Sequence, residues 1–161
     1  MALLPGVGSA LQLGQLPQQW HDDSGRVLPL GSLTGHRVIL SMAYTNCHYL
    51  CPTTIREFQR MQKVLDERGE QATFVIVGYD SERDDPAAWH QYRKNHGLTR
   101  DNWHFLAGNR EATHQLARAL GFDFWTYDEH VMHSPRVAIF DGRGQLAVVS
   151  DAASADWPNL L

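Results

Sequence analysis

Two segments of the chain, 36–44 and 73–79, carry almost continuous runs of apolar residues. Such runs, without polar residues at alternate positions, are typical of strands in a parallel sheet that is covered on both faces. Between these segments, apolar residues recur at the spacing of one helix face, at Ile55, Phe58, Met61, Val64 and Leu65. A strand, a helix and a second strand in this order predict a right-handed βαβ unit.

The remaining pattern predicts two further helices and a terminal hairpin. Pro86 suits the first turn of a helix over 86–96, and Asn109 suits the cap of a helix over 110–120. A glycine follows each helix and is expected to end it. Short β-prone segments predict strands over 103–108, 122–127, 137–140 and 146–149. The last two of these strands are expected to form the hairpin.

The length of 161 residues suits a single domain with one hydrophobic core. Residues 1–18 are rich in Gly, Pro and Gln, which predicts a flexible N-terminal arm before a single domain over 19–161. This domain is expected to begin with a hairpin over 19–30 and to end in a short helix within 154–161. The order of elements, a βαβ unit, a helical connection and a terminal β-hairpin, predicts an α/β protein with a thioredoxin-like fold and an N-terminal β-hairpin.

Composition and charge are those of an ordinary globular protein. Hydrophobic residues make up 43% and charged residues 20%, and the formal net charge of -4 argues against binding to nucleic acid or to an anionic membrane surface. No segment reaches the roughly 18–20 apolar residues of a membrane span. Pro5 and Gly6 interrupt the apolar start, which also lacks the basic segment of a signal peptide. We therefore expect the chain as given to be soluble.

Both cysteines of the chain, Cys47 and Cys51, lie in the turn between the strand 36–44 and the helix that follows it. Pro52 is well tolerated in the first turn of a helix, so Cys51 is expected to be the N-cap. The partial positive charge at a helix N-terminus stabilises a thiolate, which is the form that attacks disulfides and binds metals. These two thiols can therefore close a disulfide or hold a soft metal ion.

Other polar residues are expected at the same edge of the sheet. In α/β sheets of this sort, sites form at the carboxyl ends of the strands, and Cys47 and Asp80 both follow a predicted strand. Pro135 opens the next strand, at the place where thioredoxin-like proteins have a cis-proline opposite the dithiol. We therefore expect a cis bond between Ser134 and Pro135, with His133 close to the thiols.

The chain contains nine histidines, and five of them are expected to serve only at the surface or in packing: His36, His90, His96, His104 and His114. His48 lies between the cysteines, but its position in the loop is expected to direct it outward. A loop expected over 130–135 contains His130 and His133. His133 is the better candidate for a ligand, because it is closer to the predicted cis-proline.

Several motifs together resemble the Sco/SenC family. They are Tyr-Thr-Asn-Cys-x-x-x-Cys-Pro at 44–52, Asp-Ser-Glu-Arg-Asp-Asp-Pro at 80–86, Trp-His-Phe-Leu at 103–106, and His-Ser at 133–134 ahead of Val-Ala-Ile-Phe-Asp at 137–141. The family consists of thioredoxin-fold copper proteins that help to assemble the CuA centre of cytochrome c oxidase. The chain departs from the family pattern at His48 and Tyr49, where the family commonly has Pro and an acidic residue.

The resemblance implies a ligand set, a partner and a location. The copper ligands that it implies are Cys47, Cys51 and His133. Asp80 and Asp84 match the family's Asp-x-x-x-Asp motif and, with Pro135, are expected around the ligands. The implied partner is a cytochrome c oxidase subunit or another copper or dithiol protein. The implied location is the periplasm or cell envelope, with the full-length protein anchored to the membrane.

The chemistry of this ligand set leaves two functions open. Two thiolates and an imidazole suit Cu(I) and can also hold Cu(II), with zinc as the main competitor. The leading function is therefore a copper metallochaperone, which is not an enzyme in the usual sense. The alternative is a thiol-disulfide oxidoreductase that uses Cys47 and Cys51 as a redox dithiol and is itself reduced by a thioredoxin-like protein. Copper binding requires His133, whereas dithiol exchange does not.

Two further interpretations are weaker. A peroxiredoxin requires Thr three residues before its reactive cysteine, and Tyr44 stands at that position. A purely structural disulfide would not account for the accompanying histidine and aspartates.

Overall fold

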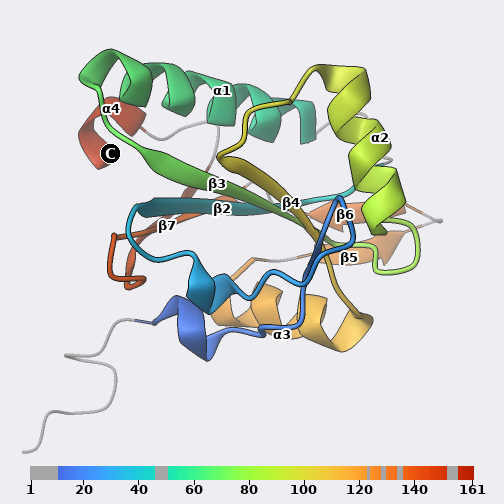
Figure 1. The fold of residues 1–161 in the computed structure, drawn as a ribbon. Helices are drawn as coiled ribbons and strands as arrows, with labels where there is room; N and C mark the ends of the chain where they lie inside the picture. The colour runs from blue at the N-terminus through green and yellow to red at the C-terminus, as the bar shows by residue number, and fades with distance from the viewer. Residues whose placement is uncertain (1–10, 46–50, 123, 128–129, 134–135, 152–155) are drawn as a thin grey trace, which may run out of the picture.

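The computed structural model describes residues 11–45, 51–122, 124–127, 130–133, 136–151 and 156–161, with the backbone alone at 51–52, 124–127 and 130–133. Six strands of this part of the chain form one sheet, in the order β1-β4-β3-β2-β7-β8 (Figure 1). They are β1 (His21–Asp22), β2 (Arg37–Ala43), β3 (Ala72–Gly78), β4 (Trp103–Ala107), β7 (Arg136–Phe140) and β8 (Leu146–Asp151). The central strands β2, β3 and β4 are parallel, and the other pairings are antiparallel.

The βαβ unit at the centre of the sheet confirms the interpretation of the two apolar segments. β2 and β3 pair in parallel register from Arg37 opposite Ala72 to Ala43 opposite Gly78. Helix α1 (Cys51–Arg68) connects them. The predicted apolar face of this helix is buried, at Ile55, Phe58, Met61 and Leu65, while Val64 is partly buried. The helix begins at Cys51 itself, so this cysteine is its first residue rather than the predicted N-cap.

Helices cover both faces of the sheet (Figure 1). Side chains of α1 and of α2 (Pro86–His96) pack on one face, because Phe58 contacts Trp103 and Trp89 contacts Phe105, and residues two apart on β4 point to the same side. The short α4 (Trp157–Leu160) lies beside α1, where the Trp157 indole N–H donates to Glu57 over 3.0 Å. Helix α3 (Arg110–Leu120) covers the opposite face.

Asn109 and the two glycines lie at the ends of α2 and α3 as the sequence predicts, and Asp85 is an additional cap at the start of α2. Asp85 and Asn109 each accept a hydrogen bond from a backbone N–H of the first helical turn, over 2.8 Å in both cases. Gly97 and Gly121 end the helices in the left-handed conformation, with φ of 64° and 69°. That conformation is readily adopted only by glycine, so these two residues stop the helices where the sequence predicts.

The segment before the terminal hairpin differs from the prediction. Residues 130–133 are not a loop but form strand β6 (His130–His133), which pairs in an antiparallel ladder with β5 (Phe124–Tyr127). The register places Met132 opposite Trp125 and His133 opposite Phe124. Val131 and Met132 are compatible with a strand, and the predicted strand 122–127 supplies the partner that a sequence pattern alone does not reveal.

Residues 11–18 also differ from the expected loose arm, because they pack against the domain. The 3-10 helix η1 (Leu13–Gln15) brings Leu13 into the core, where it is 1% exposed, and Leu16 is 3% exposed. The Leu13 N–H donates to the carbonyl of Gly144 over 2.8 Å. The side-chain amide of Gln18 donates to the carbonyls of Leu13 and Leu16 and so closes this turn. The domain therefore includes these residues.

The predicted N-terminal hairpin is present in a reduced form. The backbone turns at 22–26, where the Asp22 carboxylate accepts hydrogen bonds from the backbone N–H groups of Ser24 and Arg26. His21 and Val27 form an isolated antiparallel bridge across this turn, and β1 pairs with β4. Within the described residues, no helix combines the length and apolar character needed to cross a bilayer.

Replacing Leu13 with Ala tests whether residues 11–18 belong to the core. We expect the free energy of unfolding to fall by about 2–4 kcal/mol, because truncating a buried Leu leaves a cavity. Urea denaturation of both proteins measures this difference. Val27→Ala is the matched control, since Val27 is 64% exposed and its truncation is expected to change stability by less than about 0.5 kcal/mol. If Leu13→Ala changes the free energy of unfolding by an equally small amount, residues 11–18 do not belong to the core and the prediction of a flexible arm stands.

Candidate dithiol and metal site

The predicted site lies at the carboxyl edge of the parallel strands. β2 ends at Ala43 and β3 at Gly78, and the Tyr79 N–H donates to the carbonyl of Ala43 over 2.8 Å, so the two strands leave the sheet side by side. The described chain runs from β2 to Thr45, and Cys51 is the first residue of α1. The connection that carries Cys47 therefore begins and ends at this edge.

The predicted site residues fall into three groups. Cys47 and the Ser134–Pro135 bond, like His48, lie outside the described residues. Cys51 and His133 are described by their backbone, at the start of α1 and at the end of β6. Asp80 and Asp84 are described in full and lie close together. In the part of the chain that the structure describes, no group of three or more His, Cys, Asp or Glu residues is arranged to hold a metal ion, so the ligand set stays a prediction.

The start of β7 limits how far the backbone of His133 can lie from the same edge of the sheet. Ser41 of β2 pairs with Val137, and its hydroxyl donates to the Arg136 carbonyl over 2.6 Å. Because β7 is antiparallel to β2, its first residues lie towards the carboxyl end of β2. His133 precedes Arg136 by three residues, which limits the distance between their Cα atoms to about 11 Å.

Asp84 is the most unusual polar residue at this edge, since its side chain is buried with only 1% exposed. Its Oδ1 accepts two hydrogen bonds from Thr45, one from the backbone N–H and one from the hydroxyl, each over 2.8 Å. Its Oδ2 accepts the backbone N–H of Asp80 over 2.9 Å. One carboxylate thus joins the segment that follows β2 to the segment that follows β3.

The spacing of the Asp-x-x-x-Asp motif explains how Asp84 reaches this place. The Asp84 N–H donates to the Asp80 carbonyl over 2.7 Å, which closes a tight turn. The Asp80 side chain accepts from the backbone N–H groups of Glu82 and Arg83, over 3.2 and 3.3 Å, and stabilises the same turn. The chain therefore returns after four residues, and Asp85 follows at once as the cap of α2.

Gly78 and Trp89 enclose Asp84 on its other sides. A Cβ atom at Gly78 would lie 2.6 Å from the Cβ of Asp84 and 3.1 Å from the indole nitrogen of Trp89, so only glycine permits this packing. Trp89 is 1% exposed, and its N–H has no hydrogen-bond partner among the described residues. Of this arrangement, the sequence predicted the place of the two aspartates but no role for Thr45, Gly78 or Trp89.

Burial raises the pKa of Asp84 to about 6, because a buried carboxyl loses the hydration that favours its charged form. The negative charge of Asp80 acts in the same direction, and the hydrogen bonds from Thr45 and Asp80 oppose it. Asp80 itself lies 3.7 Å from the guanidinium of Arg83. The carboxyl of Asp84 therefore changes its charge near pH 6 rather than near pH 4.

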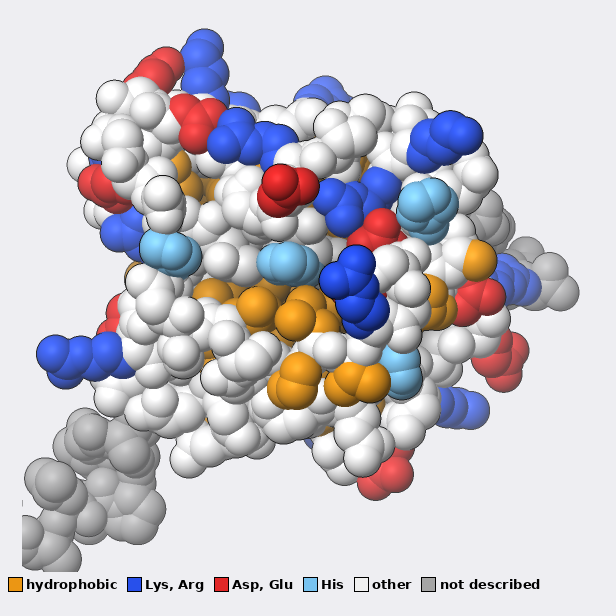
Figure 2. Space-filling view, in the orientation of Figure 1, with side chains coloured by type: hydrophobic (Ala, Val, Ile, Leu, Met, Phe, Trp, Pro, Cys, Tyr) orange, Lys and Arg blue, Asp and Glu red, His pale blue; other side chains and the backbone are white. Residues whose placement is uncertain are grey.

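The five histidines that the sequence assigns to the surface or to packing lie on several elements: His36 precedes β2, His90 and His96 lie on α2, His104 lies on β4 and His114 lies on α3. Figure 2 shows histidine side chains at separate places on one face of the molecule. Partial burial lowers the pKa of His104, and the charge of Arg93 adds to this shift. His90 lies 3.6 Å from a carboxylate oxygen of Asp23. None of these residues forms part of a metal-ligand group within the described chain.

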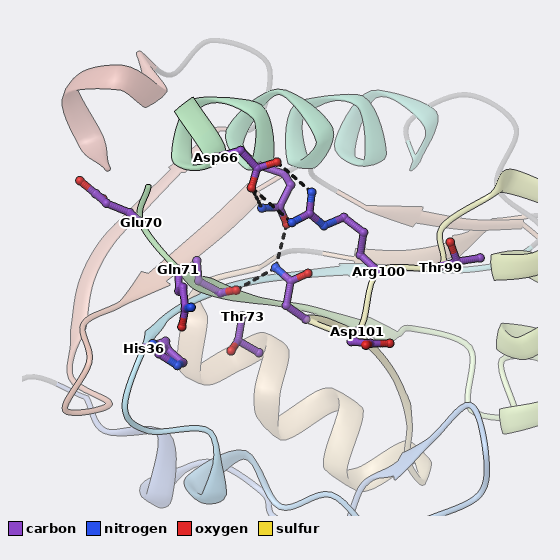
Figure 3. A pocket seen from close by; sticks show the side chains of 11 residues that line it. His36, Asp66, Glu70, Gln71, Thr73, Thr99, Arg100 and Asp101 are labelled. Atoms are coloured by element: carbon purple, nitrogen blue, oxygen red, sulfur yellow. Dashed lines mark hydrogen bonds and ion pairs between the residues drawn. The ribbon is translucent and has the colours of Figure 1, made fainter. Parts of the chain in front are cut away.

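A cavity of about 620 Å³ lies at the opposite end of the sheet (Figure 3). It is lined by residues at the amino ends of the strands, including His36, Gln71 and Asn102. Its polar groups largely satisfy each other, since Arg100 pairs with Asp66 over 2.8 Å and the Asn102 amide donates to Gln62 over 2.8 Å. The cavity is therefore not a second part of the dithiol site.

Comparison with known sequences identifies the family. The sequence pattern of SCO1/SenC matches this chain over residues 15–156. The chain belongs to the SCO1/SenC family. A SCO1 protein homolog of Bacillus subtilis is 28% identical over 92 residues, which cover 57% of this chain and 48% of that protein. Across four curated relatives, the chain covers between 36% and 63% of the relative's own length.

Solved structures confirm the thioredoxin-like fold. Arabidopsis thaliana ScoI, determined with copper bound, superposes with a TM-score of 0.79 at 21% identity, covering 92% of each chain. BsSco, described as a member of the Sco family of cytochrome c oxidase assembly proteins with a disulfide switch, superposes with a TM-score of 0.79 at 20% identity, covering 94% of this chain and 91% of that one. At these identities the structural likeness concerns the fold.

The raised pKa of Asp84 predicts a pH dependence of stability. In the unfolded chain its pKa returns to about 3.9, so its protonated form favours the folded state. The contribution is complete below about pH 4 and is lost as the pH rises through about 6, by an amount on the order of 3 kcal/mol. We expect the stability of the wild type relative to Asp84→Asn to fall by about this amount between pH 4 and pH 7.5.

Urea denaturation of both proteins in reduced form measures this difference. Asp80, Glu82 and Arg83, the other charged groups of this turn, are present in both proteins, so their own titration largely cancels. A difference between wild type and Asp84→Asn that stays constant with pH would show that the Asp84 pKa is not raised.

Proposed function

We propose that this protein is a copper metallochaperone that binds copper through Cys47, Cys51 and His133 and prepares the CuA site of a cytochrome c oxidase subunit. The observation that carries the proposal is the position of the dithiol segment in a SCO1/SenC chain. This segment joins the carboxyl end of β2 to the first residue of α1. A helix N-terminus beside two thiols favours their thiolate form, which is the form that binds metal.

The ligand chemistry supports copper as the cargo. Thiolate sulfur is a soft ligand that favours Cu(I), and an imidazole nitrogen also suits copper. The limited distance between His133 and the start of β7 supports its participation, since β7 starts beside β2. Zinc accepts the same donor types and is the main competitor. The copper bound in Arabidopsis ScoI supports copper as the cargo of this family member.

In the proposed cycle, the disulfide of Cys47 and Cys51 is first reduced. This step takes two electrons and two protons from a dithiol protein, such as a thioredoxin-like reductant, which becomes a disulfide itself. The two thiols lose their protons when copper binds together with His133. A partner with more ligands then removes the ion by stepwise ligand exchange. Asp80 is proposed to orient the polar groups of the copper site by hydrogen bonding.

The relatives support a role in oxidase assembly. BsSco is described as belonging to a family of cytochrome c oxidase assembly proteins. We propose the same target for this chain, or another copper or dithiol protein, and the periplasm or cell envelope as its location, with the full-length protein anchored to the membrane.

A thiol-disulfide oxidoreductase is the second candidate function. The disulfide switch described for BsSco favours it, as does the position of the dithiol segment before a helix in a thioredoxin-like fold. In this function Cys47 and Cys51 reduce a disulfide of the partner and become oxidised themselves. No copper ligand other than the two cysteines is then required, so His133 separates the two functions.

An anaerobic titration of the reduced protein with Cu(I), in competition with a chromogenic Cu(I) chelator, tests the proposal. We expect one copper per chain, and a loss of affinity of at least about 100-fold in Cys47→Ser, Cys51→Ser and His133→Ala, because each removes a ligand. His90→Ala is the matched control and is expected to bind copper like the wild type. If His133→Ala binds equally well while both Cys variants lose reductase activity towards a model disulfide, the oxidoreductase replaces the chaperone.

A further inference from the structure

One buried carboxylate, that of Asp84, accepts two hydrogen bonds from Thr45 at the start of the dithiol segment. Thr45 is the last described residue before Cys47, from which it is separated only by Asn46. Both its backbone N–H and its hydroxyl donate to the same oxygen of Asp84, over 2.8 Å each. Asp84 lies 39 residues further along the chain, so this contact joins two segments that are distant in sequence.

We propose that Asp84 is a positioning residue for the dithiol: through Thr45 it fixes the start of the loop that carries Cys47, and it thereby sets the reduction potential and the copper affinity of the cysteine pair. This inference rests on the proposed function for its copper part. Its redox part requires only that Cys47 and Cys51 form a reversible disulfide.

The first support comes from the contacts that compensate for the burial of this carboxylate: among the described residues, they are made by Thr45 and Asp80. Burying an ionisable group is unfavourable unless donors compensate, and an apolar side chain would fill the same space at lower free energy. Asp84 does not cap α2, because Asp85 does so. Its described hydrogen bonds go only to Thr45 and to the backbone of Asp80. The described contacts of the carboxylate therefore hold the two strand ends at the site.

The second support is that Asp84 is itself held in place. Gly78 leaves no room for even one additional carbon atom between the strand, Asp84 and Trp89. The backbone turn that carries Asp84 is closed by its own N–H bond to the Asp80 carbonyl and by the Asp80 side chain. Because Gly78, Trp89 and the turn at Asp80 fix the carboxylate, its hydrogen bonds to Thr45 also fix the position of Thr45.

The expected effect on the dithiol follows from the difference between its two redox states. In the oxidised state a covalent bond between Cys47 and Cys51 restrains the loop. In the reduced state that restraint is absent, so the position of Cys47 depends more strongly on the bonds at Thr45. Losing them is expected to destabilise the reduced and copper-loaded forms more than the disulfide form.

The experiment compares isosteric and conservative variants of both partners. Thr45→Val removes the hydroxyl donor and keeps the shape, Thr45→Ser keeps the hydroxyl, and Asp84→Asn replaces the carboxylate. Thr113→Val is the matched control, because Thr113 is fully buried in α3 and its hydroxyl donates to the carbonyl of Arg110 over 2.8 Å, a hydrogen bond that involves neither Thr45 nor Asp84. Reduction potentials are measured in dithiothreitol redox buffers, and Cu(I) affinity is measured by chelator competition.

We expect Thr45→Val and Asp84→Asn to shift the equilibrium towards the disulfide by about tenfold, or about 30 mV for this two-electron couple. Cu(I) affinity is expected to fall by a similar factor, because the same positioning serves copper. Thr45→Ser is expected to behave like the wild type. Thr113→Val is expected to lower stability without changing either quantity, which separates positioning from a general loss of structure.

The inference is overturned if Thr45→Val and Asp84→Asn both keep the wild-type potential within about twofold in the equilibrium constant, or if Thr113→Val shifts it as much as they do. Should Asp84→Asn fail to fold, the comparison of Thr45→Val with Thr45→Ser decides. A wild-type protein that does not bind Cu(I) would refute the proposed function, while the potentials would still decide the role of Asp84.

Discussion

The parallel pairing of β2 with β3 is the constraint on which the rest of the site depends. It buries two apolar strands against each other and brings their carboxyl ends to one edge. A parallel pair requires a crossover, and α1 supplies it, so the connection that carries Cys47 has to leave from this edge. The antiparallel addition of β7 then returns the chain from the His133 segment to the same side of the sheet.

The strand ends are held together at this edge by polar contacts as well as by the sheet. Asp84 accepts hydrogen bonds from the segments that follow both strands. Gly78 leaves space for Asp84 because it has no side chain. The same geometry explains why its carboxyl keeps its proton to a higher pH than usual. The turn that holds Asp84 is thus bonded to Thr45, two residues before the predicted copper ligand Cys47.

Local sequence signals predicted most of the fold. Asn109, Gly97 and Gly121 determine the ends of helices through their own backbone conformation or capping bonds, and such signals act over a few residues. Leu13 and strand β6 were not predicted, because each depends on a partner that is distant in sequence or needs a register to be known. The two aspartates were predicted from their motif, whereas the role of Thr45 emerged only from three-dimensional contacts.

X-ray absorption spectroscopy of the reduced protein loaded with one equivalent of Cu(I) tests the three-ligand copper site, because it reports the atoms bound to the metal. We expect two sulfur ligands and one nitrogen ligand in the wild type, and loss of the nitrogen contribution in His133→Ala. A copper ion bound by sulfur alone, with a spectrum that His133→Ala does not alter, would contradict the three-ligand site and leave the dithiol as a redox pair.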